Sequence, residues 1–368
     1  GCILLRPQSY VSSNGNRYTL LTAGNGVSGA FAKVYTNGML NSPEVLDTGS
    51  HNVDYVVSRR SAVAAADDLG VTNATAASVS AAANTVETTL QELDSLSNKA
   101  LTNNVLVSGA ASLQAADDDA LYASFNSLSA ATYANSVAIH SIEQGKQAQL
   151  FLDSLNDVVA GDTQALLNYT HTDTRWQQSG ASGKQDSNGV LAGASTNLDG
   201  LTVGAAYTHN HTGWNESFGH RAQTDSNGLI FGARYLLANQ SYLKGLLGYS
   251  RFSNDVTRQL VVGEESETVR NKIHGNLWQA GMAAGKKFDL NERLSITPEV
   301  GLRYDHITHS AFSESSDTGF GWSAERLNEG VLAATGEVRA EYAFSSAVAA
   351  AAQLGFEHDF SSRSFNTN

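Results

Sequence analysis

The second half of the chain alternates apolar and polar residues with a period of two, and no other feature restricts its fold as strongly. From Leu294 to Tyr304 every second residue is apolar or aromatic, and the residues between them are polar, charged or glycine. This is the side-chain period of a β-strand, whose successive side chains point to opposite faces. The sequence therefore predicts an antiparallel sheet of nine strands, centred near residues 170, 191, 205, 232, 247, 279, 300, 338 and 354.

The expected connections alternate in length, which favours a membrane barrel over a soluble sandwich. Short connections are predicted at 197–200, 238–241, 289–293 and 344–346, and long polar ones at 177–186, 212–223, 253–268 and 308–325. Outer-membrane barrels have short periplasmic turns and longer external loops, with aromatic girdles near the strand ends. Aromatic residues gather at such positions: Tyr207, Tyr235, Tyr249, Tyr304, Tyr342 and Phe344. A soluble β-protein with one wet face is the alternative.

The composition agrees with an outer-membrane barrel and excludes several other classes. Charged residues make up 16% of the chain and hydrophobic residues 41%, both below the usual ~25% and ~45–50%. The net charge of −13 argues against a nucleic-acid partner, which needs a basic surface. The single cysteine, Cys2, leaves no disulfide framework. No apolar run reaches the ~20 residues of a membrane helix, and no signal peptide is visible at the N-terminus.

The polar face of the predicted strands carries charges of both signs. A narrow polar pore suits such groups, because they can neutralise one another inside it. The residues that we expect to face the lumen are Arg234, Glu299, Arg303, Glu337, Arg339, Glu341 and Glu357.

Two stretches of different character precede the sheet. Residues 1–60 contain short alternating runs separated by turn signals such as Asn14-Gly15, which predicts several short strands. Residues 61–158 contain no proline and are rich in alanine, which predicts helices. The last helix should span about 133–157, and its middle is polar almost all round. Such a helix is either solvated or enclosed in a polar cavity.

This order of segments resembles the C-terminal region of type V secretion autotransporters. The run Tyr18-Thr19-Leu20-Leu21-Thr22-Ala23-Gly24-Asn25-Gly26-Val27-Ser28-Gly29-Ala30-Phe31 is similar to the autochaperone segment that ends many passengers, and Val53–Val57 resembles its later strand. The resemblance implies a mainly β protein with three parts. Residues 1–60 would be the end of the passenger, with an autochaperone-like, β-helix-like stretch. Residues 61–158 would form a helical linker with a pore helix at about 133–157, and residues 159–368 the translocator β-barrel.

The resemblance also implies a function and a location. The barrel would lie in the outer membrane of a Gram-negative bacterium and would export and display an N-terminal passenger, an adhesin-like or other surface protein. Its partners would be outer-membrane lipid, the barrel-assembly machinery, periplasmic chaperones and its own passenger. The protein would be a monomer without cofactor or metal. A pore or surface-binding barrel without passenger export is the alternative.

Two further expectations follow from the resemblance. The pore helix would direct Gln144, Lys146, Gln147 and Gln149 toward Arg234, Glu299, Arg303 and Glu341. Barrels of this family are expected to have twelve strands and an aromatic last residue. Only nine are found before the terminal Asn366-Thr367-Asn368, so about three strands are expected to be missing.

Catalytic signatures are absent from the sequence. It contains no Gly-x-Ser-x-Gly, Walker A, His-Glu-x-x-His or EF-hand pattern, so we expect no enzyme. His209 and His211 share one face, but the ten histidines are otherwise scattered and predict no metal site. Asn103-Asn104 is similar to the asparagine pair at which some autotransporters release their passenger, although its flanking residues depart from that motif.

Overall fold

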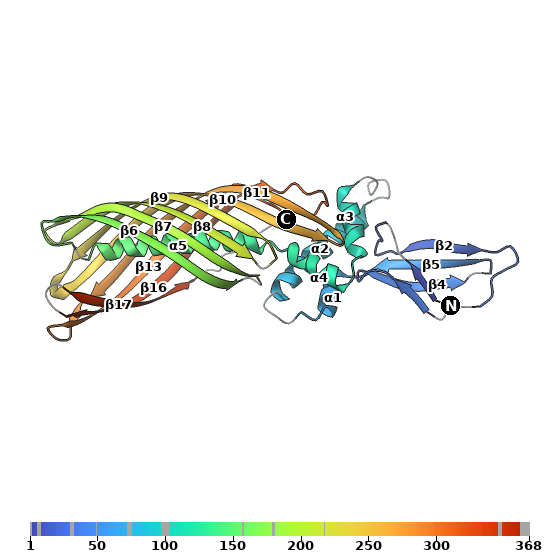
Figure 1. Ribbon diagram of the computed structural model, residues 1–368, viewed down its shortest axis with the longest axis horizontal. Helices are drawn as coiled ribbons and strands as arrows, with labels where there is room; N and C mark the ends of the chain where they lie inside the picture. Colours follow the sequence, from blue (N-terminus) through green and yellow to red (C-terminus); the bar gives the residue numbers. More distant parts are fainter. Residues whose placement is uncertain are drawn as a thin grey trace.

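A large curved sheet encloses one long helix, and smaller elements lie beyond one end of it (Figure 1). The structure, a computed structural model, describes residues 2–5, 9–29, 33–48, 50–71, 76–96, 104–156, 158–178, 181–216, 218–344 and 348–360. A group of helices lies next to the end of the sheet, and a small set of strands lies beyond them. The described part is therefore elongated, with its three kinds of element in series.

The large sheet is antiparallel, and nine of its strands pair in the order of the chain. Each of the nine predicted segments contains one of these strands, which confirms the predicted fold class. The strands are β6 (Thr163–Gln178), β7 (Ala181–Leu198), β8 (Leu201–Glu216), β9 (Arg221–Leu236), β10 (Ser241–Val262), β11 (Glu265–Lys286), β13 (Leu294–His309), β16 (Leu327–Ala343) and β17 (Ala349–Asp359), and the short β12 (Phe288–Asp289) pairs with β13. Strands β6 and β17 are the two edges, and among the described residues neither has a second partner.

The sheet exposes its apolar face and buries its polar face. On β13, Val300 is 66% exposed and Leu302 is 45% exposed on the outer face. Glu299, which precedes Val300 and points to the inner face, is only 8% exposed. Leu247 on β10 and Leu167 on β6 are also well exposed. A water-soluble sheet would do the reverse, so the outer face has the apolar band that a barrel presents to lipid.

Three of the four predicted long loops are wrong. Strands β6 and β7 continue through most of 177–186, β8 and β9 leave only 217–220 between them, and β10 and β11 are joined by a turn at Gly263 and Glu264. The prediction failed at these strand ends because their outward residues are largely polar, and the inner face of β10 mixes buried polar residues such as Arg258 with apolar ones such as Leu260. The backbone hydrogen bonds of these strand ends to neighbouring strands do not require alternation. Only the fourth connection, after His309, is a long loop, and it contains the short strands β14 (Phe312–Ser313) and β15 (Ser323–Ala324).

The N-terminal part contains two small sheets. Strands β1 (Cys2–Leu5) and β3 (Lys33–Thr36) pair in parallel, and β2 (Asn16–Thr22), β5 (Asn52–Arg59) and β4 (Asn41–Thr48) form an antiparallel sheet in that order. Within the run that resembles an autochaperone segment, residues 27–29 form no strand. Gly26 and Gly29 there have φ angles of 90° and 102°, which interrupt an extended strand. Ala30 and Phe31 lie outside the described residues.

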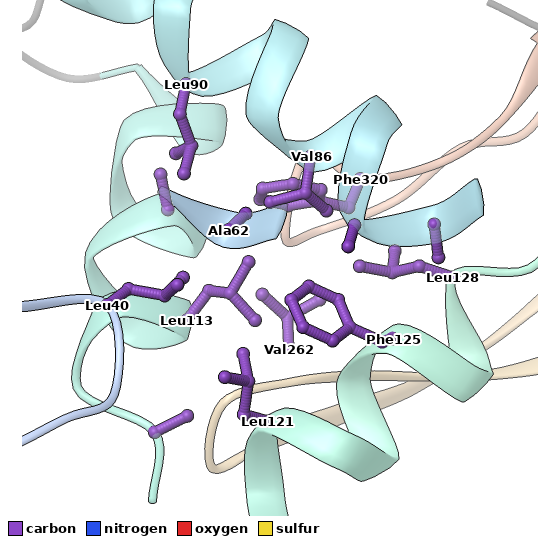
Figure 2. Packing of buried hydrophobic residues seen from close by; sticks show 14 of the residues in the cluster. Leu40, Ala62, Val86, Leu90, Leu113, Leu121, Phe125, Leu128, Val262 and Phe320 are labelled. Atoms are coloured by element: carbon purple, nitrogen blue, oxygen red, sulfur yellow. The ribbon is translucent and has the colours of Figure 1, made fainter. Parts of the chain in front are cut away.

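Four helices pack into a common hydrophobic core (Figure 2). They are α1 (Ala62–Asp68), α2 (Ala76–Ser95), α3 (Val105–Gln114) and α4 (Asp118–Ser127). Val86 and Leu90 of α2 lie with Leu113 of α3 and Phe125 of α4, and Val262 from the tip of β10 completes the cluster. Asp117 caps α4 by accepting a hydrogen bond from the backbone N–H of Ala120, as expected for an acidic helix start. The sheet and the helices therefore share one core.

None of the described helices combines the length and the apolar character needed to cross a membrane.

A buried ion-pair network joins the N-terminal sheet to helix α2. Arg59, whose side chain is 5% exposed, binds Glu87 at 3.0 Å and Asp94 at 2.9 Å. Tyr10 donates a hydrogen bond of 2.7 Å to the other oxygen of Asp94. Burial by itself raises the pKa of Asp94 and Glu87, but hydrogen bonds from Tyr10, Ser13, Arg59 and the Ala62 backbone outweigh it, so both pKa values lie below their ordinary 3.8 and 4.5.

The junction between β5 and α2 should therefore be sensitive to acid. Carboxylates with a lowered folded-state pKa stabilise the fold above their unfolded pKa, and this contribution is lost as the pH falls through the folded value. We expect hydrogen-exchange protection of α2 and β5 to be constant between about pH 8 and 5 and to fall below about pH 4. In the variant Arg59→Met, protection should be low at pH 7 and should not fall further in acid. A constant protection down to pH 3 in the unmodified chain would contradict the assigned role.

Candidate functional site: helix α5 inside the sheet

Helix α5 (Ala131–Ser154) runs lengthwise inside the curved sheet (Figure 1) and contacts β7, β8, β9 and β10. Several of its polar residues are buried: Glu143 is 3% exposed, and Gln144 and Gln147 are 1% exposed, whereas the side chain of Lys146 is 46% exposed. Buried polar groups cost free energy unless they form hydrogen bonds. A helix that is polar in its middle is therefore stable here only if the inner face of the sheet supplies partners.

The inner face does supply partners for the glutamines. Gln144 donates a hydrogen bond of 3.0 Å to Ser226 Oγ, and Gln147 donates one of 2.9 Å to Asn210 Oδ1. Gln149 donates to Glu337 Oε2 at 2.9 Å. Lys146 instead bonds to Glu143 Oε1 of its own helix at 2.7 Å, and Gln185 of β7 donates to the same oxygen at 2.7 Å. Amide and hydroxyl groups therefore hold much of the helix in place.

These hydrogen-bond partners differ from the predicted ones. The sequence predicted that the four helix residues face Arg234, Glu299, Arg303 and Glu341, but Gln144 and Gln147 bond to Ser226 and Asn210 instead. Lys146 and Gln149 do line one cavity together with Glu299 and Arg303. Gln144 and Gln147 face uncharged inner residues of β9 and β8, whereas Gln149 reaches the carboxylate of Glu337 on β16. Alternation along a strand reveals the inner face but not which strand a helix residue meets.

A buried lysine joins the C-terminal end of α5 to strands β10 and β13. Lys244 of β10 is fully shielded and lies 2.7 Å from Glu299 and 3.4 Å from Asp153 at the end of the helix. Tyr242 also donates a hydrogen bond of 2.7 Å to Glu299. A buried cation is tolerated only when it is paired and hydrogen-bonded. Lys244 was not identified from the sequence, because the inner residues of β10 mix apolar and polar types and show no continuous polar row.

Arg303 lies beside α5 at Gly145. It binds Glu357 through two hydrogen bonds of 2.7 and 2.8 Å and Asp305 at 3.2 Å. A Cβ atom at Gly145 would lie only 2.8 Å from Arg303 Nη1, so the glycine allows the helix to approach the guanidinium. A cavity of 310 Å³ remains beside this contact, and Lys146, Glu299 and Glu337 are among the residues that line it.

The other residues predicted to face the lumen also lie on the inner face. Arg234 stacks over the ring of Tyr242 at 4.7 Å, and Arg339 lies 3.9 Å from Glu341. The register places Glu337 opposite the buried Glu299, and on the next strand it places Arg339 opposite Gln353 and Thr335 opposite Glu357. All of these residues therefore lie on the same face of the sheet as Glu299. The arrangement concentrates charges of both signs around one side of the helix.

An apolar layer fills the space between the sheet and the C-terminal end of α5. Phe151 and Leu155 are fully buried against Leu191, Ile230 and Leu246 of the sheet. The inner face of β9 has Gly232 beside Phe151, which makes room for the aromatic ring. Burying aromatic and aliphatic side chains excludes water from this level.

A second buried ion pair holds the N-terminal end of α5. Arg258 of β10 and Glu314 of the long loop are both 0% exposed and lie 2.8 Å apart. Glu314 also accepts hydrogen bonds from the Tyr133 hydroxyl at 2.6 Å and from the Trp322 backbone at 2.8 Å. Arg258 donates to the Ser127 carbonyl at 2.7 Å. This cluster could not be predicted from the sequence, because Arg258 and Glu314 both lie within predicted loops.

The possible cleavage position is only partly described. Asn103 lies outside the described residues, and Asn104 is the N-cap of α3, where its side chain accepts a hydrogen bond from Leu106. His209 and His211 contact Asn227 and Asp225 through Nδ1. Within the described ranges, no three His, Cys, Asp or Glu side chains form a group that could hold a metal.

Comparisons with known proteins agree on one family. A family model described as "Autotransporter beta-domain" matches residues 164–368. The Neisserial autotransporter lipoprotein NalP of Neisseria meningitidis serogroup B is 30% identical over 242 residues, which are 66% of this chain and 22% of NalP. The putative uncharacterized protein YaiT of Escherichia coli is 30% identical over 118 residues, 31% of this chain and 12% of YaiT. The chain thus spans about a fifth of the length of NalP.

A solved structure shows the same architecture. The translocator domain of NalP from Neisseria meningitidis superposes with a TM-score of 0.59 at 27% sequence identity, covering 65% of this chain and 83% of that one. This family consists of outer-membrane translocators, which are transporters rather than catalysts, and the predicted location in the Gram-negative outer membrane agrees with it. The chain belongs to the autotransporter β-domain family.

Proposed function

We propose that the sheet forms the pore through which the N-terminal part of this protein reaches the cell surface, and that α5 stays in the pore as its plug. The observation that carries the proposal is the path of the chain. Helix α5 leaves the sheet at Ala131, beside the Arg258–Glu314 pair, and leads directly to the helices and the N-terminal strands beyond that end (Figure 1). The displayed part would be an adhesin-like or other surface protein.

The end at which the helices lie is assigned to the cell exterior. The long loop 310–326 lies at this end, whereas β7 and β8 are joined at the other end by Asp199 and Gly200. Long loops outside and short turns in the periplasm are the rule for such barrels. The exposed apolar outer face also requires help before insertion, so we expect assembly to use periplasmic chaperones and the barrel-assembly machinery.

Surface display can be tested by inserting one epitope at two positions. The first lies between Gly24 and Asn25, in an exposed turn of the N-terminal part, and the second lies between Asn239 and Gln240, in an exposed short turn of the sheet. Antibody should label intact cells that carry the first insertion. It should label cells that carry the second insertion only after permeabilisation.

Either of two outcomes would contradict the proposal. Labelling of the Asn239 epitope on intact cells would reverse the orientation of the sheet. If the Gly24 epitope were reached only after permeabilisation, although the folded protein was present in the outer membrane, passenger export would be excluded. A pore without export would then be the better description.

A further inference from the structure

The outer face of the sheet repeats one hydrogen-bonded unit across six strands. In each copy the hydroxyl of an outward-facing tyrosine donates a hydrogen bond to an asparagine on the next strand. This asparagine lies two residues nearer the helical end of the sheet than the residue directly opposite the tyrosine. Two of the copies also bring a histidine Nδ1 to the same asparagine oxygen, at 3.0 Å in each case. The pairs are Tyr169 with Asn188 on β6 and β7, Tyr207 with Asn227 on β8 and β9, and Tyr249 with Asn276 on β10 and β11.

This repeat marks a boundary on the outer surface. Tyrosine rings with an anchored polar end are typical of the level where hydrocarbon meets headgroups. On one side of the repeat, outward residues such as Phe231, Leu247 and Leu302 are apolar and exposed. On the other side the outward residues are polar, and histidines, arginines, lysines and aspartates alternate there with uncharged residues such as Gln223, Ser253 and Thr257. The outer surface therefore changes from lipid-facing to headgroup-facing at this level.

Cations lie at two levels along the strands, both on the helical side of the tyrosines of these pairs. Arg251 lies on the first row, opposite Asn227 and Asn276. Six residues further along β10 a second row crosses the sheet at Thr257, and it contains four cations on four different strands, all of them exposed: Arg175, Lys184, Arg221 and Arg270. At about 3.4 Å per residue, the two rows are about 20 Å apart along the strands.

Among the described residues, some of the cations on this face pair with an aspartate and others form no ion pair. Lys184 pairs with Asp173 and Lys272 with Asp255, at 3.0 and 3.1 Å. In the part of the chain that the structure describes, no ion pair involves Arg221, Arg251 or Arg270. This is notable in a chain with a net charge of −13. Guanidinium groups bind phosphate well because their donors match its oxygens.

We infer that the outer face of β8 to β11 binds a phosphorylated glycolipid of the outer leaflet. Its acyl chains would lie on the apolar band below the tyrosines. Arg251 would bind the phosphate nearest those chains, and Arg221 and Arg270 would bind phosphates on sugars further out. A simple phospholipid reaches only the first height, so the second row favours a lipid of the lipopolysaccharide class. The inference rests on the outward direction assigned under the proposed function.

The test compares two triple variants of the whole chain, folded in non-ionic detergent. Arg221→Gln, Arg251→Gln and Arg270→Gln remove the cations of the proposed site. Lys286→Gln, Lys287→Gln and Arg293→Gln remove the same charge at the opposite end of the sheet. The probe is a lipopolysaccharide with a short phosphorylated sugar core, and native mass spectrometry or calorimetry measures its binding.

The first triple variant should bind this probe about 100-fold more weakly, because each cation near an anionic lipid surface contributes roughly fivefold. The second should bind as the unmodified chain does, and the dephosphorylated probe should bind weakly to all three. Equal loss in both triple variants, no loss in the first, or equal binding of the dephosphorylated probe would each overturn the inference. Heat-dependent mobility on gels shows that the variants are folded. The assay needs no export, so its result is independent of the epitope test.

Discussion

Replacing Arg258 with methionine should loosen the packing of the 310–326 loop against the N-terminal end of α5. The substitution would leave Glu314 buried with its hydrogen bonds from Tyr133 and Trp322 but without its cation. Removing one partner of a buried ion pair typically costs about 3–5 kcal/mol. Hydrogen-exchange protection of the loop 312–324 and of the first turns of α5 should therefore fall by about two to three orders of magnitude.

Two further variants separate this effect from a general loss of stability. The double variant Arg258→Met with Glu314→Gln should recover much of the protection, because neither charge is then buried alone. Lys272→Met removes a cation from the exposed pair with Asp255 and should cost less than about 1 kcal/mol. If Arg258→Met behaved like Lys272→Met, the buried pair would not be what holds the loop to the helix.

Replacing residues 133–157 with a glycine-serine linker of equal length should open the pore. The linker keeps the connection between the helices and β6 but removes the glutamine contacts and the apolar layer at Phe151 and Leu155. A helix with its side chains is about 10–12 Å wide, so its loss would leave a water-filled channel of about that width. Single-channel recordings in planar bilayers should change from closed or brief openings to a steady large conductance, with altered ion selectivity.

A matched replacement shows whether the position of the helix matters. Helix α3 (Val105–Gln114) lies outside the sheet, and its exchange for the same kind of linker should leave the conductance low. A low conductance after replacement of 133–157 would show that α5 is not the plug. A high conductance after replacement of α3 would show that the external helices contribute to closure.

The strands could be predicted because lipid and lumen impose different polarity on alternate residues. On β13 the exposed Val300 and the buried Glu299 show the same alternation that the sequence shows. The prediction of strands from alternating polarity failed at the ends of β10 and β11, where neither face of the strands meets hydrocarbon. Strand pairing there is a property of the backbone and of the neighbouring strands, and a single segment does not report it.

Predicting the charged contacts was a different problem. The inward direction of Arg303 and Glu299 follows from parity along one strand, but their partners depend on which strands and helix residues come together. Lys244 meets Asp153 across 91 residues, and Arg258 meets Glu314 across 56. Such distances in sequence are bridged by the curvature of the sheet and by the rotation of α5, neither of which leaves a local pattern.

The tip of the β10–β11 hairpin has a consequence for cooperativity. Leu260, Val262 and Val269 are at most 2% exposed because they belong to the core of helices α1 to α4. The hairpin of the large sheet and helices α1 to α4 thus share a single packed interior, so unfolding of the helices should also release the hairpin tip. A sheet produced without residues 61–130 would expose these three side chains to water and would tend to associate with itself. The change in composition near residue 158 therefore separates two kinds of sequence but does not separate two independently stable units.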